Sequence, residues 1–395
     1  MSTEQKDYTE KIVIKNFGGI KDLEMPINKI NVLIGPQAAG KSMVAKLLFY
    51  FKDFFYELVD DLINRLSKRE INDKYMARFK EYFPTTAWPK NHFEIHYFKG
   101  NVKLSIYRKK IRSIKFEYSE NFHEWLKEVR KEITNFPSEA YEIIVYEDPI
   151  TNGGFEKQIF MPAGRNFFAD LQANIFSFLS NKQHIDPFLI EFGKIYQQIK
   201  GNGKLNNETI LKAEYKREYN KDFLVHKDGR KVNLSYASSG QQEVLPLLVI
   251  LDAFSNNGLD NRVSLYIEEP EAHLFPNAQK EIVELLAKVV NSSNNNIQIV
   301  VTTHSPYILS AFNNLLYAGQ IEKNNVENEK KLTALYKTVE KESIVKPNTL
   351  NAFAMVKGEK INIIDEETQL IGDNVLDEIS NVIANQFDKL LDLDE

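Results

Sequence analysis

The chain has 395 residues, of which 43% are hydrophobic and 27% charged, as expected of a globular protein with a sizeable core and one or two domains. It contains no cysteine, which excludes disulfides, cysteine-ligated zinc and iron–sulfur clusters, and its net charge of −5 argues against a general nucleic-acid-binding surface, which needs a basic face. No apolar run is long enough to span a membrane and residues 1–7 do not resemble a signal peptide, so we expect a cytoplasmic protein without a membrane partner.

The first predicted elements are short strands that lead into a phosphate-binding loop. Strands are expected at residues 11–17, 23–27 and 30–34, and a helical pattern begins at residue 43. The loop between them fills every position of G-x-x-x-x-G-K-[ST] with Gly35, Pro36, Gln37, Ala38, Ala39, Gly40, Lys41 and Ser42. Its backbone N–H groups and the positive end of the next helix would face nucleotide phosphates.

Two residues of this loop have specific expected roles. Lys41 would reach the β- and γ-phosphates, and the hydroxyl of Ser42 would ligate Mg²⁺. The alternative is a glycine turn that precedes Lys-Ser by chance. The strand–loop–helix context favours the phosphate loop over that turn.

The middle of the chain shows patterns of both helices and strands. Helices are expected at residues 51–83, 122–133 and 166–200. Strands are expected at residues 93–98, 102–107, 111–118, 158–161, 213–225 and 231–234. Two segments rich in Gly, Ser or Asn, residues 201–207 and 291–296, predict loops.

Basic residues in this region have roles that the sequence leaves open. The run at residues 107–115 has the pattern of a β-hairpin, and a solvated hairpin is favoured over a contact with DNA or a partner. Arg165 follows the predicted strand at 158–161. It could contact nucleotide or a partner subunit, and a structural salt bridge is an equally good interpretation.

Three later segments carry further candidate residues. Ser238, Ser239 and Gly240 open an apolar helix, a pattern that suits an anion-facing N-terminus but also an ordinary helix cap. An apolar strand at residues 263–267 ends in Glu268 and Glu269, which predicts a Mg²⁺-side carboxylate and a base for an attacking water. A buried strand at residues 297–303 delivers His304, which is interpreted as a γ-phosphate sensor.

The C-terminal part is expected to pack on this core. Residues 322–331 are charged and predicted to be exposed, and strands are expected at residues 332–339, 352–356 and 360–364. The last element is an amphipathic helix, interpreted as a core element in preference to an oligomer contact. Its apolar face comprises Val375, Leu376, Ile379, Val382, Ile383, Phe387 and Leu390.

With these segments in this order, the chain resembles the ABC-type ATPase fold. It is similar to the branch that includes SMC proteins, RecF and the OLD-like group with the AAA_15 and AAA_21 families, many of whose members serve in antiphage defence. The resemblance covers residues 10–57 and 232–320. Residues 162–165 are also similar to an Ile-Pro-Ala-x-Arg segment of OLD-like ATPases.

The resemblance implies roles for individual residues. Ser238 to Gly240 would be the signature motif that contacts the γ-phosphate held by the other subunit, and Glu268 the Mg²⁺-linked acid. Glu269 would be the catalytic base, residues 271–274 the D-loop and His304 the switch histidine. Ser239 stands where transporters have glycine, which bears on the rate of hydrolysis more than on binding.

The expected fold class is α/β, an ABC-type P-loop NTPase fold with a mixed sheet and helices. Residues 1–57 and 230–320 would form the ATPase core, residues 58–229 an α+β insertion, and residues 321–395 strands and a helix packed on the core. The expected function is a dimeric ATPase switch that uses ATP and Mg²⁺, acting in antiphage defence with a separately encoded effector nuclease or toxin. The alternative is a RecF- or SMC-like DNA repair ATPase that binds DNA through its ATP-closed dimer.

Overall fold

The computed structural model describes most of the chain. The described residues are 10–110, 113–139, 144, 156–169, 185–199, 205, 208–219, 221–256, 262–292, 297–372 and 384–391. None of the helices in these ranges has the length and hydropathy needed to cross a membrane. Most of the predicted loop at 201–207, much of the predicted helix at 166–200, residues 293–296 and Val375 to Ile383 of the predicted terminal helix lie outside them.

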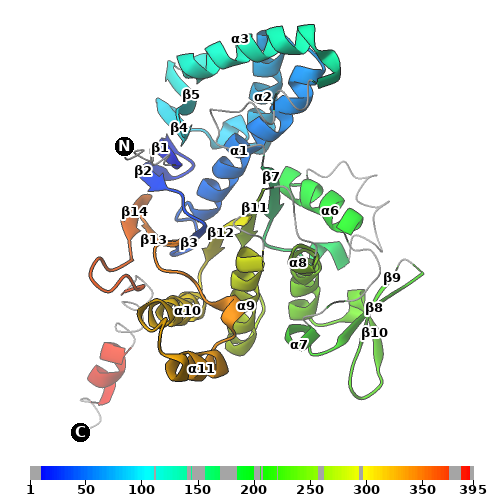
Figure 1. Ribbon diagram of the computed structural model, residues 1–395, viewed down its shortest axis with the longest axis vertical. Helices are drawn as coiled ribbons and strands as arrows, with labels where there is room; N and C mark the ends of the chain where they lie inside the picture. Colours follow the sequence, from blue (N-terminus) through cyan, green and yellow to red (C-terminus); the bar gives the residue numbers. More distant parts are fainter. Residues whose placement is uncertain are drawn as a thin grey trace.

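A large mixed sheet organises the described part of the chain (Figure 1). Its eleven strands, in sheet order, are β6 (Ser113–Tyr118), β5 (Val102–Lys110), β4 (Phe93–Lys99), β1 (Lys11–Phe17), β2 (Ile20–Pro26), β14 (Glu359–Asn362), β13 (Leu350–Val356), β3 (Ile30–Ile34), β12 (Ile297–Thr303), β11 (Val263–Glu268) and β7 (Lys157–Met161). One half of the sheet is parallel and comprises β13, β3, β12, β11 and β7. Strands β6, β5, β4, β1 and β2 form the antiparallel half of the sheet.

Alternating side chains of the parallel strands supply two hydrophobic cores, one on each face. Along β3, Val32 and Ile34 join one core, whereas Leu33 joins the other. In the same way, Ile267 of β11 and Tyr266 beside it face opposite cores. Strands buried on both faces read as continuous apolar runs, which is why these segments could be recognised from the sequence.

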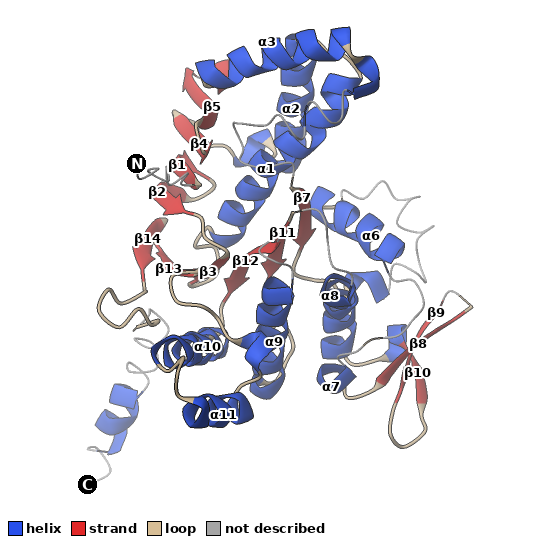
Figure 2. Cartoon of the chain, in the orientation of Figure 1, coloured by secondary structure: helices blue, strands red, loops and turns tan. Residues whose placement is uncertain are grey.

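Helices cover both faces of the parallel strands (Figure 2). On one face lie α1 (Lys41–Ile63), α2 (Lys68–Tyr82) and, over the antiparallel half, α3 (Glu120–Asn135). On the other lie α8 (Ser239–Asn256), α9 (Pro276–Ser292), α10 (Pro306–Asn324) and α11 (Glu329–Thr338). Helix α6 (Pro187–Ile199) contacts β7 at the sheet edge, and α7 is the short turn Glu208–Leu211. The α/β fold class is therefore confirmed, with the helices layered on a mixed sheet.

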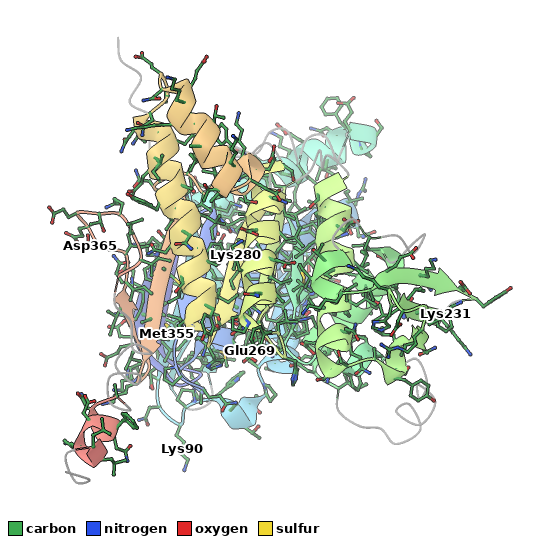
Figure 3. The ribbon with its side chains drawn as sticks, turned by 90° about the horizontal axis from the view of Figure 1, so that it is seen from below. Lys90, Lys231, Glu269, Lys280, Met355 and Asp365 are labelled. Carbon is green, nitrogen blue, oxygen red and sulfur yellow. The ribbon has the colours of Figure 1, made fainter. Side chains whose placement is uncertain are left out.

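A second, three-stranded sheet extends from one side of the molecule. It comprises β8 (Glu214–Glu218), β9 (Lys221–Val225) and β10 (Lys231–Asn233), all antiparallel. Figure 3 shows Lys231 at this side, away from the sheet centre. The strand predicted at residues 213–225 is thus a hairpin of two strands.

The continuity of helix α1 and of the large sheet bears on the expected domain division. The boundary between residues 57 and 58 falls inside α1, a continuous helix of 23 residues. Strands β4, β5, β6 and β7, which lie in the range expected to form an insertion, belong to the same sheet as β3. Strand β7 is hydrogen-bonded in parallel to β11, so it completes the layer that carries the candidate motifs.

Two predictions for the C-terminal part are wrong. Residues 332–339 were predicted as a strand but lie mostly in α11, because Asn328 caps the helix by accepting a hydrogen bond from the N–H of Lys331, and Leu335 is buried against α10. In the helical segment 384–391, Phe387 and Leu390 are exposed and do not join the core.

The basic hairpin strands have partly structural roles. The guanidinium of Arg108 donates to the carbonyls of Pro89 and Asn91 and lies over the ring of Phe93. Lys115 lies 3.5 Å from Glu117 on the exposed side of β6. These contacts favour the solvated hairpin over a nucleic-acid site.

A buried ionic network joins the two halves of the sheet. Glu156, just before β7, accepts bonds from Lys52 of α1 at 2.9 Å and Lys99 of β4 at 2.8 Å. Its Oε2 also accepts from the hydroxyl of Ser264 at 2.7 Å. Lys52 lies 3.2 Å from Glu10 as well, and its side chain is only 2% exposed. This network holds α1 against the strands on which the candidate site is built.

Candidate functional site

The candidate residues meet at the carboxyl edge of the parallel strands. The phosphate loop follows β3, Glu269 follows β11, and His304 follows β12. Ligands of open α/β sheets bind at this edge, where the loops between strands and helices converge. In Figure 3, Glu269 and Met355 mark the carboxyl ends of β11 and β13.

The phosphate loop is shaped by two glycines. A Cβ at Gly35 would lie 2.3 Å from the carbonyl oxygen of Met355, so the close approach of β13 requires glycine there. Gly40, at φ 97°, forms the N-cap of α1 in the left-handed region that favours glycine. Between them Pro36, Gln37 and Ala38 are exposed, so this part of the loop is open to a ligand.

Lys41 is folded into the loop and faces the other candidates. Its ammonium donates to the carbonyls of Gly35 at 2.8 Å and Pro36 at 2.9 Å, and lies 3.2 Å from Nε2 of His304. Burial lowers the pKa of Lys41, whereas the carboxylates of Glu269, Glu271 and Glu268 oppose this effect. The ammonium is therefore placed in a partly desolvated position among acidic groups.

His304 and Glu269 form the next contact. Nε2 of His304 lies 3.2 Å from Oε1 of Glu269, and both side chains are about a third exposed, at 32% and 37%. Glu269 has φ 43°, an unusual left-handed backbone for a residue other than glycine. Lys41, His304 and Glu269, distant in sequence, thus form one chain of polar contacts.

Buried oxygen atoms beside this chain of contacts suit a cation. Oε2 of Glu268 accepts a hydrogen bond from the N–H of Ala163, while its Oε1 is buried without a hydrogen-bond partner among the described residues. Ser42 is the second residue of α1 and is exposed. No group of three or more acidic or histidine side chains suited to a metal occurs in the described ranges. A hydroxyl and one carboxylate fit Mg²⁺, which is held by few protein ligands together with substrate phosphates.

Glu271, in the expected D-loop, is tied to the His304 strand. Its Oε1 accepts from the hydroxyl of Thr303 and from the N–H of His304, both at 2.7 Å. Its Oε2 is buried and, within the described residues, unpartnered. Glu271 therefore fixes the backbone that presents His304.

The predicted signature residues open α8, and among the described residues no hydrogen bond joins them to the phosphate loop. Ser238 and Ser239 are exposed, and the hydroxyl of Ser238 accepts a hydrogen bond from the N–H of Gln241 at 3.3 Å, as a helix cap does. Gly240 lies so close to the D-loop that a Cβ would be 2.7 Å from the carbonyl oxygen of His273. Ser238 therefore caps α8, and the exposure of both serines also leaves them accessible to a ligand.

An AAA ATPase domain model (AAA_15) matches residues 108–309, more than half of the chain. The chain belongs to this AAA ATPase domain family. The matched range includes the signature residues, Glu268, Glu269 and His304, and begins after the phosphate loop.

Curated relatives of this AAA ATPase domain match over shorter ranges. The retron Ec83 probable ATPase of Escherichia coli is 33% identical over 94 residues, covering 22% of this chain and 17% of the relative. The endonuclease GajA of Bacillus cereus is 28% identical over 158 residues, covering 34% of this chain and 22% of the relative. The chain thus matches about a fifth of the length of these relatives. Among solved structures, the SMC head domain of Thermotoga maritima is 13% identical with a TM-score of 0.40, covering 90% of this chain and 98% of that chain.

Arg165 is the candidate residue of this AAA ATPase domain whose role the sequence left open. Arg165 is fully buried, at 0% exposure, so in this structure it is not free to contact a nucleotide or a partner subunit. It lies 3.2 Å from Oε1 of Glu243, a residue of α8 that is 1% exposed. The structural salt bridge is therefore the interpretation that the geometry favours.

Glu243 is a buried residue of this region for which the sequence predicts no role. A signal was present, because Glu243 is a single charge directly before the apolar run of α8, where a buried carboxylate needs a cationic or N–H partner. Its partners could not be identified from the sequence, since they lie about eighty residues away on the loop after β7.

Proposed function

We propose that this chain binds and hydrolyses ATP and works as a dimeric switch. The observation that supports this best is the convergence of Lys41, His304 and Glu269 at the carboxyl edge of the sheet. A phosphate-binding cation, a histidine and a carboxylate within contact distance are the groups that phosphoryl transfer to water requires.

In the proposed reaction, ATP phosphates enter the exposed phosphate loop. Lys41 exchanges its bonds to the carbonyls of Gly35 and Pro36 for the β- and γ-phosphates. Glu269 takes a proton from a water that attacks the γ-phosphorus, and ADP leaves. His304 donates a hydrogen bond to the γ-phosphate. Ser42 and Glu268 would hold Mg²⁺, which supplies charge neutralisation at the phosphates.

The dimer follows from the separation of two motifs. The phosphate loop follows β3, whereas Gly240 packs against His273 in the loop after β11, two strand spacings or about 10 Å away. Ser238 and Ser239 are exposed, and among the described residues no hydrogen bond joins them to the phosphate loop, so we infer that they serve the nucleotide of another subunit. Two copies placed head to tail with two-fold symmetry would bring each signature to the nucleotide of the other.

We assign the chain to bacterial antiphage defence, as a sensor or scaffold acting with a separately encoded effector nuclease or toxin. Support comes from the motif set and from relatives that include a retron ATPase and an endonuclease.

The test uses the Glu269→Gln protein, expressed together with its genomic neighbours. We expect the unaltered protein to hydrolyse ATP, and the variant to bind ATP-Mg²⁺ but lose about 100-fold or more in kcat. The variant should also accumulate as a dimer or larger assembly whose mass in solution depends on ATP. Glu327→Gln, an exposed carboxylate beyond α10, is the matched control and should behave as the parent.

Other results would contradict separate parts of the proposal. Hydrolysis by Glu269→Gln at the parental rate would reject Glu269 as the base. Unchanged hydrolysis by Ser238→Arg would reject the composite site. An ATP-independent monomer without a companion protein would reject the switch and the defence role. Salt-sensitive, ATP-dependent DNA binding would instead favour the DNA repair alternative.

A further inference from the structure

Arg165 lies between α8, the helix that the signature residues open, and the end of β11 that carries Glu268 and Glu269. Its guanidinium reaches five oxygen atoms. These are the carbonyls of Glu243 (3.1 Å), Pro162 (2.8 Å), Glu268 (2.7 Å) and Glu269 (3.0 Å), and Oε1 of Glu243 (3.2 Å). A guanidinium has five N–H donors in a rigid fork, so these acceptors match its full capacity.

The carboxylate of Glu243 binds the backbone of the loop that carries Arg165. Its Oε1 accepts from the N–H groups of Gly164 at 3.1 Å and Arg165 at 3.0 Å, and its Oε2 accepts from that of Asn166 at 2.8 Å. Glu243 lies one helical turn after Gly240, the last signature residue. The start of α8 is therefore attached through Arg165 to the backbone that carries Glu268 and Glu269.

The contact with Glu269 has a conformational consequence. At φ 43° the Glu269 backbone is in the left-handed region, which is unfavourable for a residue with a Cβ. Its carbonyl accepts from both Arg165 and the N–H of Ala272, and its own N–H donates to the carbonyl of Thr302. These bonds hold the backbone in the conformation that directs the Glu269 side chain to His304.

We infer that Arg165 and Glu243 are positioning residues that couple the signature helix to the catalytic carboxylates. A subunit or phosphate that docks at the start of α8 would shift Glu243, and Arg165 would transmit that shift to the carbonyls of Glu268 and Glu269. Binding at the signature residues would thereby set the rate of hydrolysis at Glu269. This inference rests on the proposed ATPase function.

The principal test is Arg165→Lys, which keeps the charge but replaces the planar fork by one nitrogen that cannot reach all five oxygens. We expect kcat for ATP to fall about 10- to 100-fold, while the dissociation constant of ATP-Mg²⁺ stays within about threefold of the parent. Glu243→Gln, which keeps the shape of the side chain, should show the same split. In a Glu269→Gln background, Arg165→Lys should lower kcat little further, because the group that it positions has already been removed.

The matched control is Glu156→Gln, which breaks a buried ion pair at the other end of β7 and should lower the melting temperature with little change in kcat. The inference is overturned if Arg165→Lys keeps kcat within about twofold, or if its kcat loss adds in full to that of Glu269→Gln. If Arg165→Lys does not fold, Glu243→Gln decides by the same two criteria. Absence of hydrolysis by the unaltered protein overturns the proposed function as well, whereas unchanged hydrolysis by both variants overturns only the coupling.

Discussion

The buried network around Glu156 gives the prediction whose magnitude can be worked out most fully. Glu156→Gln removes the charge that pairs with Lys52 and Lys99 and leaves both ammoniums in a buried position. Breaking a buried ion pair by removing one partner costs about 3–5 kcal/mol. Because Lys52 keeps Glu10 at 3.2 Å, we expect the lower end of this range, about 3 kcal/mol.

This cost can be measured as a change in melting temperature. With an unfolding entropy of roughly 2 cal/mol/K per residue, a chain of 395 residues should lose about 4 °C. Thermal unfolding followed by circular dichroism at pH 7.5 is the assay. Glu117→Gln, an exposed carboxylate on β6, is the control and should change the melting temperature by less than about 1 °C.

The effect should also depend on pH. Burial disfavours the charged form of Glu156, but Lys52 and Lys99 outweigh it and hold its pKa well below the usual range. A carboxylate with a depressed pKa in the folded state stabilises the protein fully above its unfolded pKa of about 4.3, and this contribution is lost as the pH falls toward the folded pKa. The difference between parent and variant should therefore shrink below about pH 4.3. A difference of less than about 1 °C at pH 7.5, or one that grows on acidification, would refute this reasoning.

Three further predictions concern the candidate site. Lys41→Ala should weaken ATP binding about 100-fold or more, measured by calorimetric titration, because a charge-assisted bond to phosphate is lost; unchanged affinity would contradict the phosphate loop. Glu268→Gln should raise the Mg²⁺ concentration for half-maximal hydrolysis about tenfold, and an unchanged Mg²⁺ requirement would reject Glu268 as a ligand. Gly240→Ala should impair hydrolysis and ATP-dependent dimerisation together, because a Cβ would be 2.7 Å from the carbonyl oxygen of His273. Parental values for both would show that the backbone near His273 moves to accommodate the added methyl group.

Elements whose signals are local could be predicted from the sequence. The phosphate loop is contiguous, and β3 was predicted at its observed bounds because a strand buried on both faces is a continuous apolar run. The helix at residues 329–338 was predicted in part as a strand, since its burial against α10 and its cap at Asn328 are not visible in hydrophobic alternation alone. The exposure of Phe387 and Leu390 likewise depends on what packs nearby.

The sequence by itself therefore determined the motifs and their order, because each motif needs only a few adjacent residues to form its local structure. Only the tertiary structure decided which residues meet. It placed β7 beside β11, which brought Arg165 to Glu243 and to the carbonyls of Glu268 and Glu269. Such contacts between segments about eighty to one hundred residues apart arise from strand order, and strand order is set by packing of the whole sheet. For that reason a residue with three open interpretations in the sequence became the central positioning residue of the proposed mechanism.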